Sequence, residues 1–336
     1  MEKQGIWKRK GIMTDQYGRN IDYMRLSITD RCNLRCCYCM PEETGMTAPD
    51  RILTEDEILR ICECAVALGI RRFKITGGEP LVRKDALELI RRLKTLPGVE
   101  KVTLTTNGVL LREVLPELKQ MGIDGINVSF DTLSEERYLR IAGRPGLSEA
   151  VRALREGISL GIPMKVNCVI LKGINDDEIT DLAGLAREMP VDVRFIEMMP
   201  MGWGKAFEGM PAGEVRQVLR SRYPELEPTE EIRGNGPAVY GRIPGFQGYV
   251  GFIDAIHGKF CSRCNRVRLT SEGFLKLCLY YRSGVDLRGP LRAGARKEEL
   301  IRLMAEAISQ KPREHQFNHQ QPEGAAEEKG MSQIGG

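Results

Sequence analysis

The sequence contains no apolar run that approaches the roughly 18 residues needed for a membrane-spanning helix. Its first ten residues, MEKQGIWKRK, are charged and are not followed by an apolar segment or a small-residue cleavage site, so no secretory signal is visible. No internal repeat is evident either. We therefore expect a cytoplasmic protein that does not contact a membrane.

An excess of charge of one sign is also missing, since 50 Lys and Arg residues are balanced by 46 Asp and Glu residues. A net charge of +4 is too small to indicate a nucleic-acid-binding protein. Hydrophobic residues at 42% and charged residues at 29% are typical of a globular protein. A length of 336 residues allows either one large α/β barrel or two domains.

Short β-branched runs alternate with helical patterns over the first 200 residues. The clearest helix begins after Thr54, which forms a capping box with Glu57. Strand alternating with helix predicts parallel strands joined by right-handed crossovers. We expect strands at 23–29, 73–76, 101–106, 125–130, 164–170 and 192–199, and further helices at about 84–95, 111–121, 148–159 and 176–188.

Six such units predict the α/β class and an incomplete, six-unit TIM-like barrel. After Met201 the sequence becomes rich in Gly and Pro, which indicates hairpins rather than further crossover units. We therefore divide the chain into a barrel at 1–204 and a C-terminal region at 205–336. Helices are expected again at 284–309, and the last 22 residues are expected to be a tail.

Ten cysteines are many for a cytosolic protein, where metal or redox roles are more common than disulfides. Cys32, Cys36 and Cys39 follow the first strand with the spacing CxxxCxxC. Three thiolates leave one iron of a 4Fe–4S cluster open to another ligand. The alternative is a structural zinc site, which would favour paired CxxC units and a fourth ligand nearby.

A second triplet comprises Cys261, Cys264 and Cys278. His257 could complete a zinc site with these residues, so a structural zinc clip and a second iron–sulfur cluster are both open from spacing alone. The open-site cluster upstream favours a second cluster. The other cysteines are interpreted as bystanders, with Cys62 and Cys168 in core positions.

The second strand ends in Thr76-Gly77-Gly78-Glu79-Pro80, where two residues without side chains leave the backbone open to a ligand. Such a turn alone also fits an ordinary strand-to-helix loop. In a barrel, however, this strand end faces the same mouth as the first cysteine loop. The two loops together therefore indicate one site.

The CxxxCxYC motif and the GGEP loop resemble those of radical S-adenosylmethionine (radical SAM) enzymes. The segments RLSITDRCNLRCCYCMP, TGGEPLVRKD, LTTNG, INVSFD and CSRCNRVRL, with the final Ile-Gly-Gly, extend the resemblance to the GTP 3',8-cyclase (molybdenum cofactor biosynthesis protein A) family. The resemblance implies a lyase for the first step of molybdenum cofactor biosynthesis. A 5'-deoxyadenosyl radical would take the 3' hydrogen of GTP, and the resulting carbon radical would attack guanine C8 to give 3',8-cyclo-7,8-dihydro-GTP.

The resemblance also implies the role of each site residue. Two 4Fe–4S clusters would be held by the two cysteine triplets, with the second cluster positioning the guanine base. The Gly335-Gly336 tail would enter the active site, although terminal glycines by themselves indicate a frayed end. The residues implied at S-adenosylmethionine are Tyr38, Gly78, Ser129 and Met199, and those implied at GTP are Arg25, Lys74, Thr105, Lys165, Arg266, Val267 and Arg268.

Two alternatives remain at this point, namely a peptide-modifying radical enzyme with an auxiliary cluster and a zinc-stabilised nucleic-acid-binding module. The first usually carries more C-terminal cysteines, and the second would need a more basic face. As partners we expect a reductant, a cyclic pyranopterin monophosphate synthase and a second copy of the chain in a homodimer. His315 and His319 have no assigned role.

Overall fold

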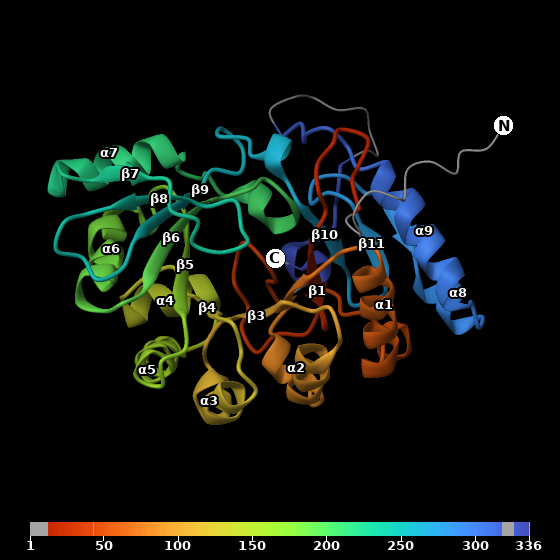
Figure 1. Cartoon of the computed structure of the whole chain (residues 1–336). Helices are drawn as coiled ribbons and strands as arrows, with labels where there is room; N and C mark the ends of the chain where they lie inside the picture. The colour runs from red at the N-terminus through yellow and green to blue at the C-terminus, as the bar shows by residue number, and fades with distance from the viewer. Residues whose placement is uncertain (1–12, 43, 318–325, 336) are drawn as a thin grey trace. The chain divides into compact units, whose positions relative to one another are not determined.

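The computed structural model describes residues 13–42, 44–317 and 326–335, and the chain divides into two compact units (Figure 1). The first unit comprises Met1–Arg31, Gly45–Val102 and Cys261–Gly336, and the second comprises Cys32–Thr44 and Thr103–Phe260. The division at residues 204 and 205 that the sequence suggested rests on composition and stays a prediction.

The described residues of the first unit form five strands in the order β12-β11-β10-β1-β2. Strand β1 pairs in parallel with both β2 and β10, while β10, β11 and β12 pair antiparallel. The bounds are β1 (Tyr23–Ser27), β2 (Arg72–Thr76), β10 (Arg266–Leu269), β11 (Phe274–Lys276) and β12 (Gly284–Asp286).

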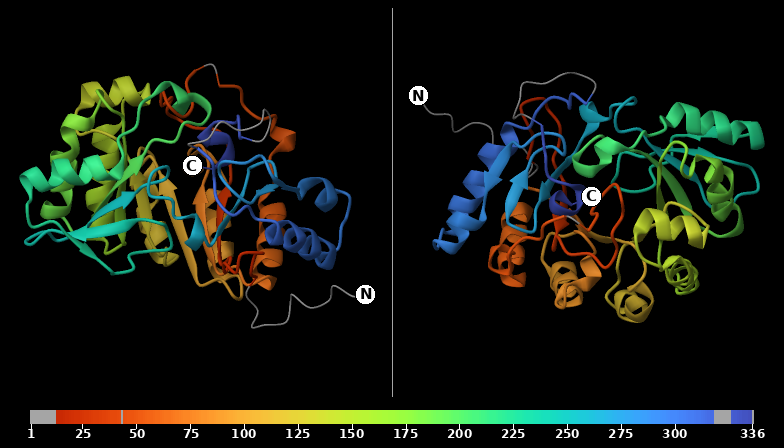
Figure 2. Two further views of the ribbon diagram at one scale, coloured as in Figure 1. Left: turned by 90° about the horizontal axis from the view of Figure 1, so that it is seen from above. Right: turned by 180° about the vertical axis from the view of Figure 1, so that it is seen from behind.

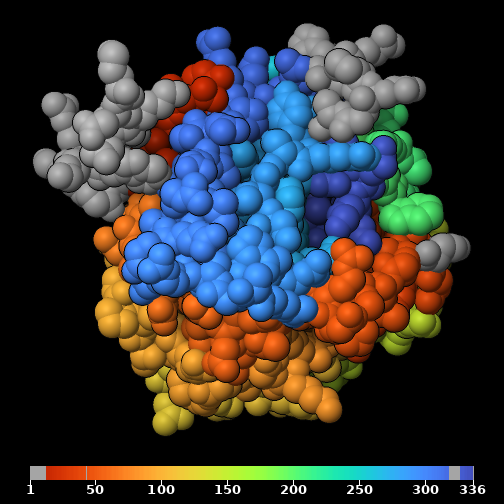
Figure 3. Space-filling view, turned by 90° about the vertical axis from the view of Figure 1, so that its right-hand side faces the viewer, coloured from red at the N-terminus to blue at the C-terminus, as the bar shows by residue number. Residues whose placement is uncertain are grey.

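In the first unit, helices from the two ends of the sequence pack against each other. Helices α1 and α9 lie side by side (Figures 1 and 2), and the Arg60 guanidinium of α1 donates to the Ala295 carbonyl just before α9. Figure 3 shows the blue C-terminal elements packed directly against orange N-terminal ones. The helices are α1 (Glu55–Ala67), α2 (Ala86–Thr95), α8 (Arg288–Arg292), α9 (Lys297–Ser309) and α10 (Met331–Ile334), with 3-10 turns η1 (Pro49–Arg51), η2 (Pro80–Val82) and η5 (Cys261–Arg263).

The second unit has the strand order β3-β4-β5-β6-β9-β8-β7. Strands β3 to β6 and β9 run parallel, and β9, β8 and β7 form an antiparallel meander. The strands are β3 (Lys101–Thr106), which starts at the unit boundary, β4 (Ile126–Ser129), β5 (Met164–Ile170), β6 (Asp192–Glu197), β7 (Glu227–Thr229), β8 (Val239–Arg242) and β9 (Val250–Ile253). The helices are α3 (Leu111–Gln120), α4 (Glu135–Ala142), α5 (Leu147–Ser159), α6 (Ile179–Glu188) and α7 (Ala212–Arg222), with 3-10 turns η3 (Asp176–Glu178) and η4 (Gly202–Ala206).

Along strand β5, apolar residues of the core alternate with polar residues that point away from it. Val166, Cys168 and Ile170 are completely buried on one face, whereas the alternate residues Lys165 and Asn167 are polar and only half-buried. Successive side chains of a strand point to opposite faces, so the apolar set packs in the core and the polar set lines the other face. The functional residues described below lie on such polar faces and at strand ends.

The α/β class and all six expected strands are confirmed as β1 to β6, and the five expected helices of the first 200 residues are confirmed. Helices α4 and α7 were missed. The hairpins expected after Met201 are confirmed by the antiparallel pairing of β7, β8 and β9, but the expectation of no further crossover was wrong, because β9 returns parallel to β6. The expectation of an unstructured tail was wrong for residues 326–335, because Ile334 is completely buried. Among the described residues, no helix has the length and apolar character needed to cross a bilayer.

The capping box at the start of α1 is confirmed and yields a stability prediction. The Glu57 backbone N–H donates to Thr54 Oγ1 at 3.3 Å, and the Thr54 N–H donates to Glu57 Oε2 at 2.8 Å. Thr54→Ala should lower the free energy of unfolding by about 1 kcal/mol because one amide at the start of α1 loses its partner. Denaturant titration would measure the change, Thr54→Ser should retain most of the stability, and equal losses in both variants would contradict this account.

Candidate functional site

The first cysteine loop, which belongs to the second unit, is held by the end of α4. The Arg35 N–H donates to the Ala142 carbonyl at 2.8 Å, and the Cys37 N–H donates to the Ile141 carbonyl at 2.9 Å. Gly143 ends α4 at φ +69°, and a Cβ there would lie 2.8 Å from the Arg35 carbonyl oxygen. Only glycine fits this left-handed position and close approach.

The three thiols of the first triplet are electrostatic neighbours. Burial raises the pKa of Cys36 well above its ordinary value, and negative charge on Cys39, Asp131 and Cys32 raises it further. Gathering thiolates in a buried place is unfavourable unless a metal centre compensates their charge. The donor set therefore fits a 4Fe–4S cluster bound by Cys32, Cys36 and Cys39.

Asn107, directly after β3, approaches the same loop. Its Nδ2 donates to Asn33 Oδ1 at 2.7 Å and to Cys32 Sγ at 3.8 Å. Hydrogen bonds to ligand sulfurs help to set the reduction potential of an iron–sulfur cluster. Sequence reasoning quoted the LTTNG segment but assigned no role to this asparagine.

Tyr38 is fixed by a carboxylate that sequence reasoning also missed. Its hydroxyl donates to Asp131 Oδ2 at 2.6 Å, and Asp131 Oδ1 accepts from the Val169 N–H at 2.8 Å. Burial raises the pKa of Asp131 to about 6, although both hydrogen bonds oppose this shift. Burial and the nearby Asp131 carboxylate raise the pKa of Tyr38, so its phenol remains a donor at neutral pH.

Ser129 and Met199, implied at S-adenosylmethionine, follow the same pattern of strand ends. Ser129 is the last residue of β4, and its hydroxyl accepts from Asn167 Nδ2 at 3.5 Å. Met199 lies two residues beyond β6. A Cβ on Gly204 would lie 2.7 Å from the Met199 carbonyl oxygen. The close approach of η4 therefore fixes the backbone at Met199.

The glycine loop of the first unit interlocks with the end of β1. The Gly78 N–H donates to the Thr29 carbonyl and the Glu79 N–H to the Arg31 carbonyl, both at 2.8 Å. A Cβ on Gly77 or Gly78 would lie 2.4 or 2.3 Å from one of these carbonyl oxygens. The glycines are therefore required for backbone packing, a role that sequence reasoning did not include.

The second triplet lies in the first unit and has a different electrostatic environment. Burial raises the pKa of Cys264, but the cations Lys311 and Arg266 outweigh burial and lower it to about 7. Burial raises the pKa of Cys261, and the neighbouring thiols Cys278 and Cys264 raise it further. The three thiols thus form a second metal-compatible group, with one member readily deprotonated.

Arg19 connects this triplet to the C-terminal segment. Its Nη1 donates at 2.8 Å to the carbonyls of both Cys261 and Arg313, and its Nη2 donates at 2.7 Å to the Pro312 carbonyl. Asp15 pairs with Arg19 Nε at 2.6 Å. Sequence reasoning missed this arginine because the carbonyls to which it donates are more than 240 residues away.

A row of cations crosses the sheet of the first unit. Lys74 of β2, Arg25 of β1 and Arg268 of β10 are direct neighbours in the parallel register. Burial lowers the pKa of Arg268, and repulsion from Arg25 and Arg266 lowers it further. Such repulsion is relieved by a polyanion, so the row fits a phosphorylated ligand. Val267 lies on the opposite face of β10 and is only 1% exposed, so only its backbone is available to a ligand.

The tail reaches this row, since the Gly335 carbonyl accepts from Arg268 Nη1. A Cβ on Gly335 would lie 3.1 Å from the Cβ of Ser27 at the end of β1. Gly336 and His319 lie outside the described residues.

The second unit contributes a corresponding polar row. Asn127 Nδ2 donates to Thr105 Oγ1 at 3.1 Å, and Lys165 follows in register on β5. Lys165 pairs with Asp192, and Asp192 also pairs with Arg233 at 2.9 Å. The charge of Lys165 is therefore already partly neutralised. Arg194, the register neighbour of Asn167, is 8% exposed, and its Nε is buried without a hydrogen-bond partner in the described part of the chain.

Comparison with known proteins assigns the chain to a family. The Radical SAM superfamily model matches residues 26–186, and the Molybdenum Cofactor Synthesis C model matches 191–317. GTP 3',8-cyclases from Moorella thermoacetica and Clostridium perfringens (strain 13 / Type A) are 45% and 41% identical, each over 96% of this chain and 100% of the relative. The chain belongs to the GTP 3',8-cyclase family.

A human relative and a solved structure extend these findings. Human Molybdenum cofactor biosynthesis protein 1 is 42% identical over 90% of this chain and 48% of its own length. The crystal structure of Streptococcus suis SuiB bound to S-adenosylmethionine has a TM-score of 0.60 at 15% identity, over 79% of this chain and 62% of SuiB. At 15% identity, the similarity to SuiB confirms only the fold. Membership of the radical SAM superfamily implies one 4Fe–4S cluster and S-adenosylmethionine as cofactors.

The contact between Tyr38 and Asp131 predicts a defect in cofactor binding. Asp131→Ala should raise the Kd for S-adenosylmethionine about tenfold, the equivalent of ~1.4 kcal/mol, because Tyr38 loses a buried hydrogen bond. Equilibrium dialysis on anaerobically reconstituted protein would measure the Kd, with iron content as a check on the cluster. Asp177→Asn, an exposed carboxylate change, is the matched control. An unchanged Kd in Asp131→Ala would exclude this role.

Proposed function

We propose that this chain is a radical SAM GTP 3',8-cyclase that converts GTP to 3',8-cyclo-7,8-dihydro-GTP, the first step of molybdenum cofactor biosynthesis. The observation that carries the proposal is a sequence identity of 41–45% to GTP 3',8-cyclases over their entire length. The similarity to SuiB, by contrast, extends only to the fold.

The first site is assigned to the cluster and to S-adenosylmethionine. Cys32, Cys36 and Cys39 would hold a 4Fe–4S cluster, and Tyr38, Gly78, Ser129 and Met199 would surround the cofactor. When bound, these groups supply the 5'-deoxyadenosyl radical that removes the 3' hydrogen of GTP. Asp131 orients the Tyr38 hydroxyl, and Gly143 permits α4 to hold the cysteine loop.

The second triplet is proposed to hold a second 4Fe–4S cluster whose open iron meets guanine. The low pKa of Cys264 supports metal ligation at neutral pH, because the thiolate is the ligand form. Arg19 fixes the backbone of Cys261 and so positions one ligand.

The cation row supports binding of the GTP triphosphate. Arg25, Lys74 and Arg268 lie next to one another in register, and Arg266 adds a fourth charge. The backbone of Val267 and the side chains of Thr105 and Lys165 complete the proposed set. The Gly335-Gly336 tail would reach substrate beside Arg268, and the hydrogen bond at Gly335 supports this placement.

The partners and setting of the reaction are further parts of the proposal. A reductant must supply the electron for cleavage of S-adenosylmethionine, and a cyclic pyranopterin monophosphate synthase would accept the product. We also propose a cytoplasmic location and a homodimer.

An anaerobic turnover assay tests the proposed function. Protein reconstituted with iron and sulfide would receive dithionite, S-adenosylmethionine and GTP, and 5'-deoxyadenosine would be measured with and without GTP. We expect release that depends on GTP together with a new cyclic nucleotide. Zinc in place of about eight irons would overturn the mechanism, and release independent of GTP would overturn the substrate assignment.

The same assay separates the roles of the two triplets. Cys32→Ser should abolish 5'-deoxyadenosine formation, whereas Cys278→Ser should retain uncoupled cleavage while losing GTP cyclisation at least tenfold more strongly. The reason is that the first triplet is assigned to the cofactor and the second to the substrate. Cys62→Ser, which alters a buried thiol away from both triplets, is the matched control. Equal loss of both activities in the Cys278 variant would contradict this division.

The tail yields a separate prediction. Deletion of Gly335 and Gly336 should leave the iron content unchanged but lower product formation more than a hundredfold, because the backbone beside Arg268 is lost. Iron analysis and product chromatography would test it, with Gln333→Ala as a control in the preceding helix. Full activity after the deletion would exclude a role for the tail.

A further inference from the structure

Three side chains that play no part in the proposed cyclase site meet at one edge of the second unit. Strands β6 and β9 pair in parallel, with Ile196 opposite Ile253. The carboxyl ends of parallel neighbours meet at the same edge of a sheet. Glu197 is the last residue of β6, Asp254 directly follows β9, and His257 lies three residues further on.

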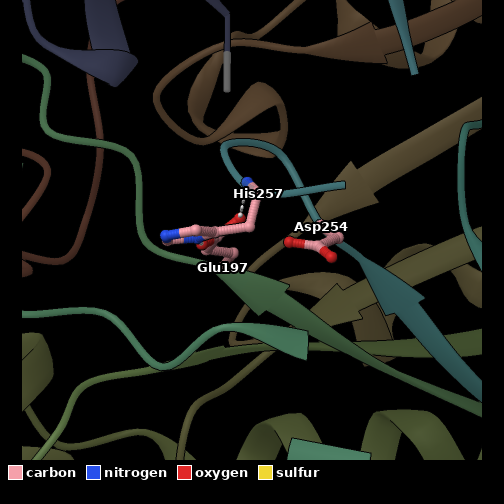
Figure 4. Close-up of side chains that lie close together, drawn as sticks. All are labelled: Glu197, Asp254 and His257. Carbon is pink, nitrogen blue, oxygen red and sulfur yellow. Dashed lines mark hydrogen bonds and ion pairs between the residues drawn. The ribbon is translucent and has the colours of Figure 1, made fainter. Parts of the chain in front are cut away.

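The donor atoms of Glu197, Asp254 and His257 all lie within 4.8 Å of one another (Figure 4). Glu197 is 4% exposed, and its Oε2 accepts from the Ile256 N–H at 2.7 Å and from the His257 N–H at 3.3 Å. His257 Nδ1 contacts Glu197 Oε1. The loop after β9 is therefore folded around the Glu197 carboxylate, which places the other two side chains beside it.

One buried carboxylate oxygen of this group has no hydrogen-bond partner among the described residues. Asp254 Oδ1 is buried and lacks a hydrogen-bond partner in the described part of the chain, although buried carboxylate oxygens are normally satisfied. Burial raises the pKa of Glu197, and contact with the Asp254 carboxylate raises it further. One imidazole thus faces two carboxylates, an arrangement that a dication would complete.

We propose that Glu197, Asp254 and His257 bind one divalent first-row metal ion such as Mn²⁺. Two carboxylate oxygens and one imidazole nitrogen suit this class of ion, and the absence of a thiolate distinguishes the site chemically from both cysteine triplets. The His257 side chain is 56% exposed, which leaves room for water to fill the remaining coordination positions. An ion here would tie the loop after β9 to β6, two residues before Met199.

Manganese titration tests the site on the full-length reconstituted protein. In metal-free buffer without GTP, which itself binds Mn²⁺, binding would be followed by loss of the six-line electron paramagnetic resonance signal of free Mn²⁺. We expect one saturable site in the wild type. Asp254→Asn and His257→Ala should each raise its Kd at least tenfold, since each removes one ligand.

Two controls make the result decisive. Glu225→Gln changes an exposed carboxylate of the same unit and should leave the Kd unchanged. Thermal melting without Mn²⁺ should show that Asp254→Asn, a change of nearly constant shape, folds like the wild type. Absence of saturable binding in the wild type, or an unchanged Kd in the folded Asp254→Asn variant, would reduce the group to a His257–Glu197 ion pair and overturn the proposal.

Discussion

The parallel register of β1 with its two neighbours is the constraint on which the cation row depends. It places Arg25 between Lys74 and Arg268, so that three cations lie on adjacent strands, with Arg268 buried. A slip by one residue would turn these side chains to the opposite face. The apolar alternate residues Met24 and Leu26, which are almost completely buried, oppose such a slip. Core packing on one face therefore holds the cations in place on the other.

Each unit brings groups of like charge close together. Cys36 has neighbouring thiols and a buried aspartate around it, and Arg268 has two neighbouring arginines. These arrangements oppose folding unless a ligand of opposite charge binds, because buried charges of one sign are costly. An iron–sulfur cluster and a triphosphate are such ligands.

Much of the fold could be predicted because its signals are local. Alternation of β-branched runs with helical patterns located β1 to β6, and the Thr54 capping box located the start of α1. Helix α4 was missed although Ser134 caps its N-terminus, since eight residues give a weak periodic signal. The buried tail was missed because its composition is polar, whereas its packing depends on partners far away in the sequence, such as Tyr280, whose carbonyl accepts from the Glu327 N–H, and Arg268, which donates to the Gly335 carbonyl.

The sequence by itself predicted which groups would carry the chemistry, since the cysteine spacing and the glycine loop are local patterns. Only the tertiary structure decided how these groups are supported, as in the contacts of Asp131 with Tyr38 and of Arg19 with Cys261. These partners are 93 and 242 residues apart, and strand pairing and loop packing bring them together. A residue that acts through a distant partner has no local signal, because its role exists only once the chain has folded.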